Sequence, residues 1–168
     1  MLIIFFFYGL AFILMGITIF MMPRRNDFLG IADDLWLVGF FGVFHGINEW
    51  VDLFILSGRP VDTGILKILG AAILPLSFVF MAAFGGRIIS KRVEQLHYLK
   101  HAWIALFAVW AVSSVISPSI LRSGIFARYL ICFPGIIISA LGVSIAARGC
   151  KDSLRWPRFY CTVSLAGS

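Results

Sequence analysis

Charged side chains are scarce in this chain of 168 residues, because Asp, Glu, Lys and Arg together make up only 13% of it. A soluble domain carries about twice that share. Hydrophobic residues make up 61%, and the mean hydropathy is +0.99. This balance excludes an ordinary soluble domain and predicts an integral membrane protein whose main partner is the lipid bilayer. The net charge of +6 predicts no nucleic-acid partner, because the basic residues lie between apolar runs, as in membrane proteins.

Cysteines are few and catalytic motifs are lacking. The three cysteines, Cys132, Cys150 and Cys161, are odd in number and form no CxxC pair, so they predict neither a disulfide framework nor a zinc site. The chain has no phosphate-binding glycine loop, no nucleophile elbow and no kinase or cyclase signature. The sequence therefore assigns no catalytic residue and no metal ligand, and any cofactor stays unknown.

Long apolar runs are what the chain has instead. A helix of about 20 apolar residues crosses a bilayer, and five stretches reach this length. They are residues 2–22, 35–57, 64–83, 99–117 and 127–147. They predict an all-α, polytopic transmembrane helix bundle of five spans within residues 1–158. Residues 159–168 are apolar but too short to span, and they predict either a short interfacial tail or the start of a truncated sixth helix.

The positions of the basic residues predict the orientation of the chain. Ten of the 14 Lys and Arg residues fall on one side, which the positive-inside rule places in the cytoplasm. The opposite side carries the other four, which are Arg59, Lys67, Arg122 and Arg128. We therefore expect a multi-pass protein of the cell membrane, with its N-terminus outside and the segment after the fifth span in the cytoplasm.

Four polar side chains interrupt the second apolar stretch: His45, Asn48, Glu49 and Asp52. At about 100° per residue they share one side of a helix. An ionisable group in hydrocarbon costs about 3 kcal/mol, so such groups persist where they face a bundle interior, a cavity or a partner. We expect this polar stripe to be the functional site, binding a ligand, a proton or an ion. The alternative is a hydrogen-bonded network that only holds helices together.

Two further faces complete the same helix. Gly39, Gly42 and Gly46 form a small-residue face, which predicts close packing against another helix. The remaining side is apolar and predicts contact with lipid. Its residues are Trp36, Phe40, Phe44, Ile47 and Val51.

Lys67 is the predicted partner of the polar stripe. It lies about one turn inside the third stretch, and Asp52 lies at a similar depth in the second. An antiparallel helix pair would place Lys67 near Asp52 or Glu49, which would offset the unfavourable burial of unpaired charges. The alternative is that Lys67 extends to the outer lipid headgroups.

Two further histidines, His97 and His101, raise the alternative of a haem protein with His45 as the second axial ligand. Depth argues against this alternative. His45 lies about ten residues inside its stretch and His101 only about two, so the two rings differ in depth by about 12 Å. We therefore interpret His97 and His101 as interfacial residues of a basic loop.

Two segments resemble a known group of membrane regions. They are residues 7–16, which contain Phe-Tyr-Gly-Leu-Ala-Phe and Met-Gly, and residues 41–54, which contain the pattern FGxxHGxxEWxD. Both are similar to the multi-helix membrane region at the N-terminus of certain bacterial sensor histidine kinases and diguanylate cyclases. In that group, further helices and cytoplasmic PAS, kinase or cyclase modules follow. The likeness covers roughly the first third of this chain.

The resemblance and the polar stripe together predict a function. We expect a membrane-embedded sensory input module that lacks a catalytic output domain in this chain, so kinase or cyclase activity is not assigned to it. Its expected partners are a second copy of the chain or a cytoplasmic signalling module. The alternatives are a small carrier or channel subunit for protons or cations, with Glu49 and Asp52 as relay groups, and a haem-bearing redox subunit.

Overall fold

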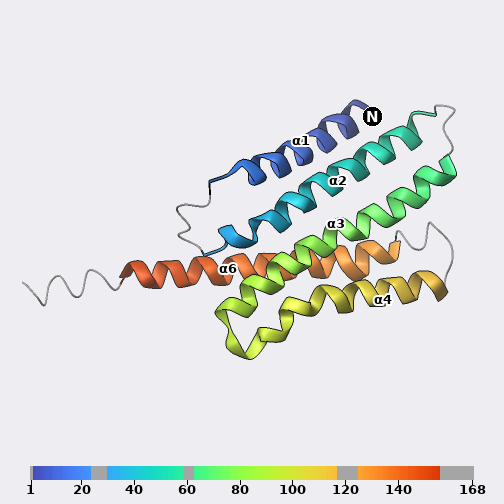
Figure 1. Ribbon diagram of the computed structural model, residues 1–168. Coiled ribbons are helices and arrows are strands. Elements are labelled where there is room, and N and C mark those ends of the chain that lie inside the picture. Colours follow the sequence, from blue (N-terminus) through green and yellow to red (C-terminus); the bar gives the residue numbers. More distant parts are fainter. Residues whose placement is uncertain (1, 24–29, 59–62, 117–124, 156–168) are drawn as a thin grey trace, which may run out of the picture.

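The computed structural model describes residues 2–23, 30–58, 63–116 and 125–155 (Figure 1). These residues form helices and no strand, which confirms the predicted all-α class. The α-helices are α1 (Leu2–Met21), α2 (Leu35–Leu56), α3 (Thr63–Arg92), α4 (Ala102–Ile116) and α6 (Phe133–Arg155). Short helical turns precede three of them: η1 (Ala32–Asp34) before α2, η2 (Glu94–His101) before α4 and η3 (Arg128–Cys132) before α6.

Helix α3 is the centre of the bundle. It packs against α2, α4, α6 and the turn η2, while α1 packs against α2 at the edge (Figure 1). The core follows from this arrangement, because the middle and end of α3 carry a dense run of buried apolar side chains, including Phe78, Val79, Phe84 and Ile88. Ile131 of η3 is fully buried against the same core.

Helix α3 also extends past the predicted end of its apolar stretch at residue 83 and continues to Arg92. The added segment stays helical because its apolar side chains, among them Ile88 and Ile89, are buried against neighbouring helices. Lys91 and Arg92 lie in the last turn, where positive charge interacts favourably with the helix dipole. The predicted tail or sixth helix at 159–168 lies outside the described residues.

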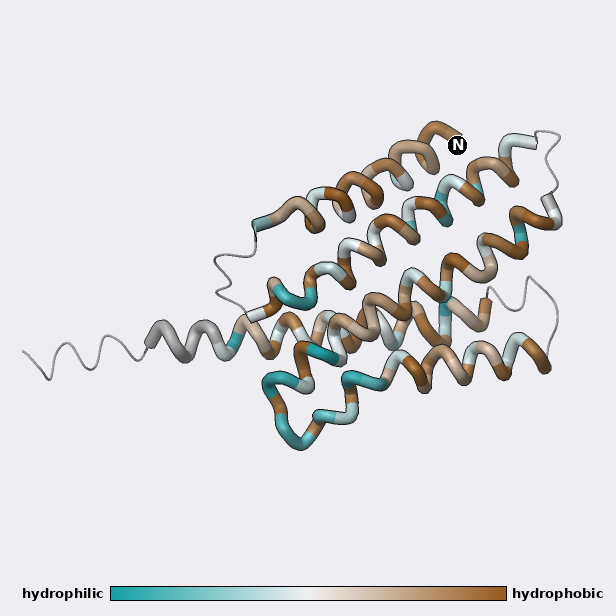
Figure 2. Tube along the Cα trace, viewed as in Figure 1, coloured by the Kyte–Doolittle hydropathy of each residue, from teal (hydrophilic) through white to brown (hydrophobic). Residues whose placement is uncertain are grey.

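Among the described residues, four helical segments are long and apolar enough to cross a membrane: Leu2–Met21, Gly64–Arg92, Glu94–Ile116 and Ile125–Gly149. This is one fewer than the five predicted, and α2 is the helix that the set does not include. The polar stripe explains the difference, since four polar side chains near the middle of α2 lower its mean hydropathy. Figure 2 shows the hydrophilic positions gathered where α3 ends and η2 lies. We call this region the charged end.

Glycines let α1 and α2 approach closely, as the small-residue face predicted. A Cβ added to Gly42 would lie 2.8 Å from the backbone oxygen of Phe12, and one added to Gly16 would lie 2.6 Å from that of Gly39. At Gly46 an added Cβ would lie 2.5 Å from the backbone oxygen of Gly9. No side chain fits between the two backbones at these points, so the glycines set the distance between the helices.

The predicted lipid face of α2 is wrong in part. Val51 is buried at 9% exposure, and Phe40 and Phe44 pack their rings against Phe80 of α3 at centroid distances of 5.4 and 5.5 Å. The reason is that α3 packs against the polar stripe of α2 and also against part of the neighbouring apolar face. Phe40 and Ile47, each at 37% exposure, remain in part on the exposed side, as predicted.

We expect Gly46→Val to loosen the α1–α2 pair, because the added side chain would collide with the α1 backbone. Overpacking of this kind destabilises by about 1–3 kcal/mol, which should lower the thermal unfolding midpoint of the protein in detergent. Gly70→Ala is the matched control, since a Cβ there meets its nearest atom at 3.5 Å. Equal losses of stability in the two variants would contradict this account of the interface.

Candidate functional site

The polar stripe lies on one face of α2, as predicted, and that face points into the bundle. His45 and Asn48 are buried at 7% and 3% exposure, and Glu49 and Asp52 are half-buried. Their spacing along the chain places them on successive turns of the same side. These groups therefore face the bundle interior, as expected, because their contact with hydrocarbon would be unfavourable.

His45 and Glu49 interact directly. The Nε2 atom of His45 lies 3.7 Å from Oε1 of Glu49, one helical turn further along α2. The other ring nitrogen, Nδ1 of His45, is buried and has no hydrogen-bond partner among the described residues. A buried donor or acceptor without a partner is unfavourable by about 1–3 kcal/mol. The surroundings of His45 therefore do not provide hydrogen-bond partners for both of its ring nitrogens.

Four aromatic rings surround the imidazole of His45, and we call them the aromatic enclosure. Phe41 stacks on it at 5.2 Å with an interplanar angle of 18°, while Phe12, Phe78 and Tyr8 approach edgewise at 4.6, 5.3 and 6.4 Å. These rings come from α1, α2 and α3. The face of an aromatic ring attracts cations. A positive charge on His45 would therefore change its contacts with these rings and, through them, the packing of the three helices.

Gly70 of α3 lies opposite the polar stripe. A Cβ added to Gly70 would lie 3.6 Å from Oδ1 of Asn48 and 4.0 Å from Oδ1 of Asp52. An added Cβ would make only ordinary van der Waals contacts here, so the amide and the carboxylate lie at the interface of α2 and α3 without crowding. The α2–α3 interface thus combines a glycine with two polar side chains.

Arg128 is the cation that acts on the two carboxylates. Its charge influences both Glu49 and Asp52, and the two carboxylates also influence each other. We call His45, Asn48, Glu49, Asp52 and Arg128 the polar cluster. Arg128 joins it from η3, so the cluster connects α2 to the chain segment that leads into α6.

The turn η3 that carries Arg128 is a π-helix, in which the backbone N–H of Phe133 donates to the carbonyl of Arg128. Pro134 follows directly and has no N–H, and its ring would crowd the preceding turn of a regular α-helix. A widened turn relieves that crowding, and such turns are frequent at functional sites. The local sequence around Pro134 thus accounts for the unusual backbone at Arg128.

Lys67 does not form the predicted ion pair. Its side chain is exposed on α3, and within the described ranges no ion pair joins it to Asp52 or Glu49. Arg128 forms no ion pair with these carboxylates in the described part of the chain either, but its charge acts on both of them. The same depth argument applied to both cations, because each lies near the outer end of an apolar stretch. Sequence reasoning counted Arg128 only as a charge that sets orientation.

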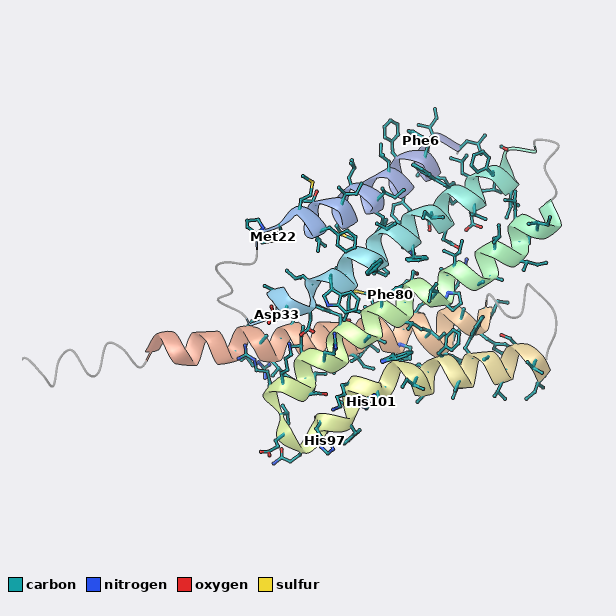
Figure 3. All side chains as sticks on the ribbon, in the orientation of Figure 1. Phe6, Met22, Asp33, Phe80, His97 and His101 are labelled. Carbon is teal, nitrogen blue, oxygen red and sulfur yellow. The ribbon has the colours of Figure 1, made fainter. Side chains whose placement is uncertain are left out.

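His97 and His101 lie at the charged end of the bundle (Figure 3). His101 lines a cavity together with Trp36, which is nine residues before His45 on α2, and His45 does not line this cavity. In the described part of the chain, no group of three or more His, Cys, Asp or Glu side chains is placed to hold a metal ion.

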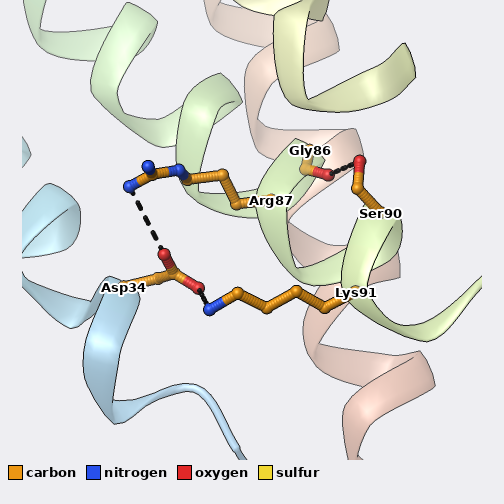
Figure 4. Close-up of polar contacts among 5 residues, drawn as sticks. All are labelled: Asp34, Gly86, Arg87, Ser90 and Lys91. Atoms are coloured by element: carbon orange, nitrogen blue, oxygen red, sulfur yellow. Dashed lines mark hydrogen bonds and ion pairs between the residues drawn. The ribbon is translucent and has the colours of Figure 1, made fainter. Parts of the chain in front are cut away.

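A second group of charged side chains, which sequence reasoning missed, lies at the charged end. We call Asp34, Arg87 and Lys91 the Asp34 cluster. The carboxylate of Asp34 is buried at 3% exposure and accepts a hydrogen bond of 2.6 Å from Nζ of Lys91, with Nη1 of Arg87 at 3.4 Å (Figure 4). These contacts tie the start of α2 to the end of α3. The guanidinium of Arg87 also lies over the ring of Trp36, at 5.8 Å from its centroid.

We expect Arg128→Gln to destabilise the bundle, because Glu49 and Asp52 would lose the cation that offsets their burial and mutual repulsion. Arg128 is itself exposed, so solvent screens its charge and the loss should be about 0.2–1 kcal/mol. Thermal unfolding of the variant in detergent measures it. The double variant Arg128→Gln/Asp52→Asn should recover part of the loss, and no recovery would argue against the electrostatic coupling.

Comparisons with known proteins identify no relative. No family model matches the chain, and neither a curated protein nor a solved structure matches it. The function is therefore argued from the polar cluster and the aromatic enclosure themselves.

Proposed function

We propose that this chain is a membrane-embedded sensory input module in which a change of charge at the polar cluster alters helix packing. The observation that carries the proposal is the position of His45, 3.7 Å from Glu49 and inside an enclosure of rings from three helices. In this proposal α2 crosses the bacterial inner membrane with the four more apolar helical segments, the N-terminus is outside and the charged end is cytoplasmic.

The physical basis is the response of the aromatic enclosure and the polar cluster to one positive charge on His45. Protonation of His45 would create an ion pair with Glu49 and a cation–π contact with the stacked ring of Phe41, each favouring a tighter arrangement. Loss of the proton would remove both attractions. Tyr8 on α1 and Glu49 on α2 are the titratable groups that face His45, and Arg128 and Asp52 act on Glu49.

The fold supplies a route from the polar cluster to the charged end. Helices α2 and α3 are continuous between the polar cluster and the Asp34 cluster, where Arg87 and Lys91 hold the two helices together. A change in their packing is therefore carried along both helices. The proposed receiver is a second copy of the chain or a cytoplasmic signalling module, consistent with the resemblance of residues 41–54 to sensor membrane regions.

A pH titration of the full chain in lipid vesicles tests this proposal. We expect a change in tryptophan fluorescence as the pH is lowered and His45 takes up a proton. Trp50 is a suitable reporter, since its Nε1 donates a hydrogen bond of 3.2 Å to the backbone oxygen of Phe6 across the α1–α2 interface. His45→Phe, which keeps an aromatic ring in the enclosure, should abolish the change.

The matched control is the double variant His97→Gln/His101→Gln, which removes the other two of the three histidines. Both lie exposed at the charged end, so the fluorescence change should persist. A transition that survives His45→Phe, or that the control variant removes, would overturn the proposed role of His45.

A second candidate function rests on the two carboxylates. Glu49 and Asp52 are half-buried beside each other and under the influence of Arg128, which is the type of grouping that proton and cation carriers use as relays. In that case, vesicles containing the protein should dissipate a proton or cation gradient. Glu49→Gln should reduce the flux at least tenfold, and Lys67→Gln should leave it unchanged. Flux equal to that of empty vesicles would eliminate this candidate.

A further inference from the structure

A cavity of about 620 Å³ lies at the charged end, away from the polar cluster. Its walls come from the start of α2, the second half of α3, the turn η2 and the start of α4. This volume is in the range of sites that hold small organic molecules. The cavity is separate from the proposed sensory site, so the inference below does not depend on the proposed function.

The walls of the cavity are apolar and rich in aromatic rings. Trp36, Phe80 and Trp103 line it from α2, α3 and α4, and Leu76 lines it one turn before Phe80. Leu76 and Arg87 both line the cavity and lie eleven residues apart on α3, so the cavity follows that helix for about 16 Å. An elongated apolar molecule fits such a space.

One end of the cavity, which we call the basic end, carries three basic side chains and no acidic one. Arg87, Lys100 and His101 line it, and within the described ranges no Asp or Glu does. Arg87 reaches Asp34 through Nη1 at 3.4 Å, while the other oxygen of Asp34 is held by Lys91 at 2.6 Å. A guanidinium has five N–H donors, so Arg87 keeps donors that this contact does not use. Lys100 and His101 are exposed.

The arrangement of the cavity therefore matches an anionic amphiphile. An apolar wall along α3 ends at a group of cations, and α3 and α4 belong to the segments that are apolar enough to cross a membrane. In such segments the charged end lies at the level of the lipid headgroups, where tryptophans also gather. Basic pockets between membrane helices bind acidic headgroups for the same electrostatic reason.

We propose that this cavity binds an acidic phospholipid. Its phosphate contacts Arg87, Lys100 and His101, and one acyl chain lies against Trp36, Phe80 and Trp103. The bilayer supplies this ligand directly, since the apolar wall and the basic end correspond to the tail and the headgroup of one lipid molecule. The neutral and zwitterionic lipids lack the net charge that the basic end selects.

Quenching of tryptophan fluorescence by brominated lipids tests the proposal on the full chain in mixed micelles. A bromine on an acyl chain quenches tryptophans that the chain contacts, and two of the chain's five tryptophans line the cavity. We expect brominated phosphatidylglycerol to quench at concentrations about tenfold lower than brominated phosphatidylcholine with the same acyl chains. Lys100→Glu should weaken binding of phosphatidylglycerol about tenfold and leave that of phosphatidylcholine unchanged.

Lys67→Glu is the matched control, because it makes the same charge reversal at an exposed lysine of α3 that does not line the cavity. It should bind phosphatidylglycerol like the unmodified chain. Ala83→Leu, which fills the apolar wall, should weaken binding of both lipids. Circular dichroism of each variant verifies that its helix content is unchanged, and Lys100→Gln replaces Lys100→Glu if that variant does not fold.

Three outcomes would overturn the proposal. Equal quenching by the two lipids would show that the basic end does not select an acidic headgroup. Equal weakening by Lys67→Glu and Lys100→Glu would place the effect on the whole surface of the protein and not in the cavity. Competition by inorganic phosphate at the concentration at which the lipid binds would assign the site to free phosphate.

Discussion

Four polar side chains on one face of α2 cannot face hydrocarbon, and the arrangement of the bundle depends on this constraint. Each must meet a protein partner, because unpaired polar groups in an apolar medium are strongly unfavourable. Helix α3 covers Asn48 and Asp52 opposite Gly70, η3 brings Arg128 to the carboxylates, and α1 closes the aromatic enclosure around His45. The other helices are placed so that α2 presents its polar face to protein.

The FGxxHGxxEWxD pattern gains a structural explanation from this packing. Gly42, Gly46 and Trp50 recur every four residues and face α1, where the glycines allow close approach and Trp50 donates a hydrogen bond to the backbone of Phe6. His45 and Glu49 recur at the same interval on the adjacent face, inside the bundle. The pattern thus combines two interfaces of one helix. Residues 7–16, the other resembling segment, supply the α1 side of the first.

The two ends of the bundle carry different chemistry. In the second half of α2, His45 is buried among aromatic rings, and Glu49 and Asp52 are half-buried on the following turns. At the charged end, the Asp34 cluster fastens α2 to α3, and the neighbouring cavity joins an apolar wall to basic side chains. Both regions share α2 and α3, which makes these two helices the common framework of the proposed sensory site and the proposed lipid site.

The sequence alone determined the features that depend on spacing and composition. The scarcity of charge indicated membrane helices, the 3.6-residue period placed His45, Asn48, Glu49 and Asp52 on one face, and the glycine spacing identified the close contact of α2. Partners from distant parts of the chain were decided only by the tertiary structure. The charge of Arg128, and not that of Lys67, acts on Glu49 and Asp52, and the turn η3 that carries Arg128 packs against α3. The contacts of Asp34, the aromatic enclosure and the cavity likewise arise where segments distant in the chain meet, and no local period in the sequence encodes such a meeting.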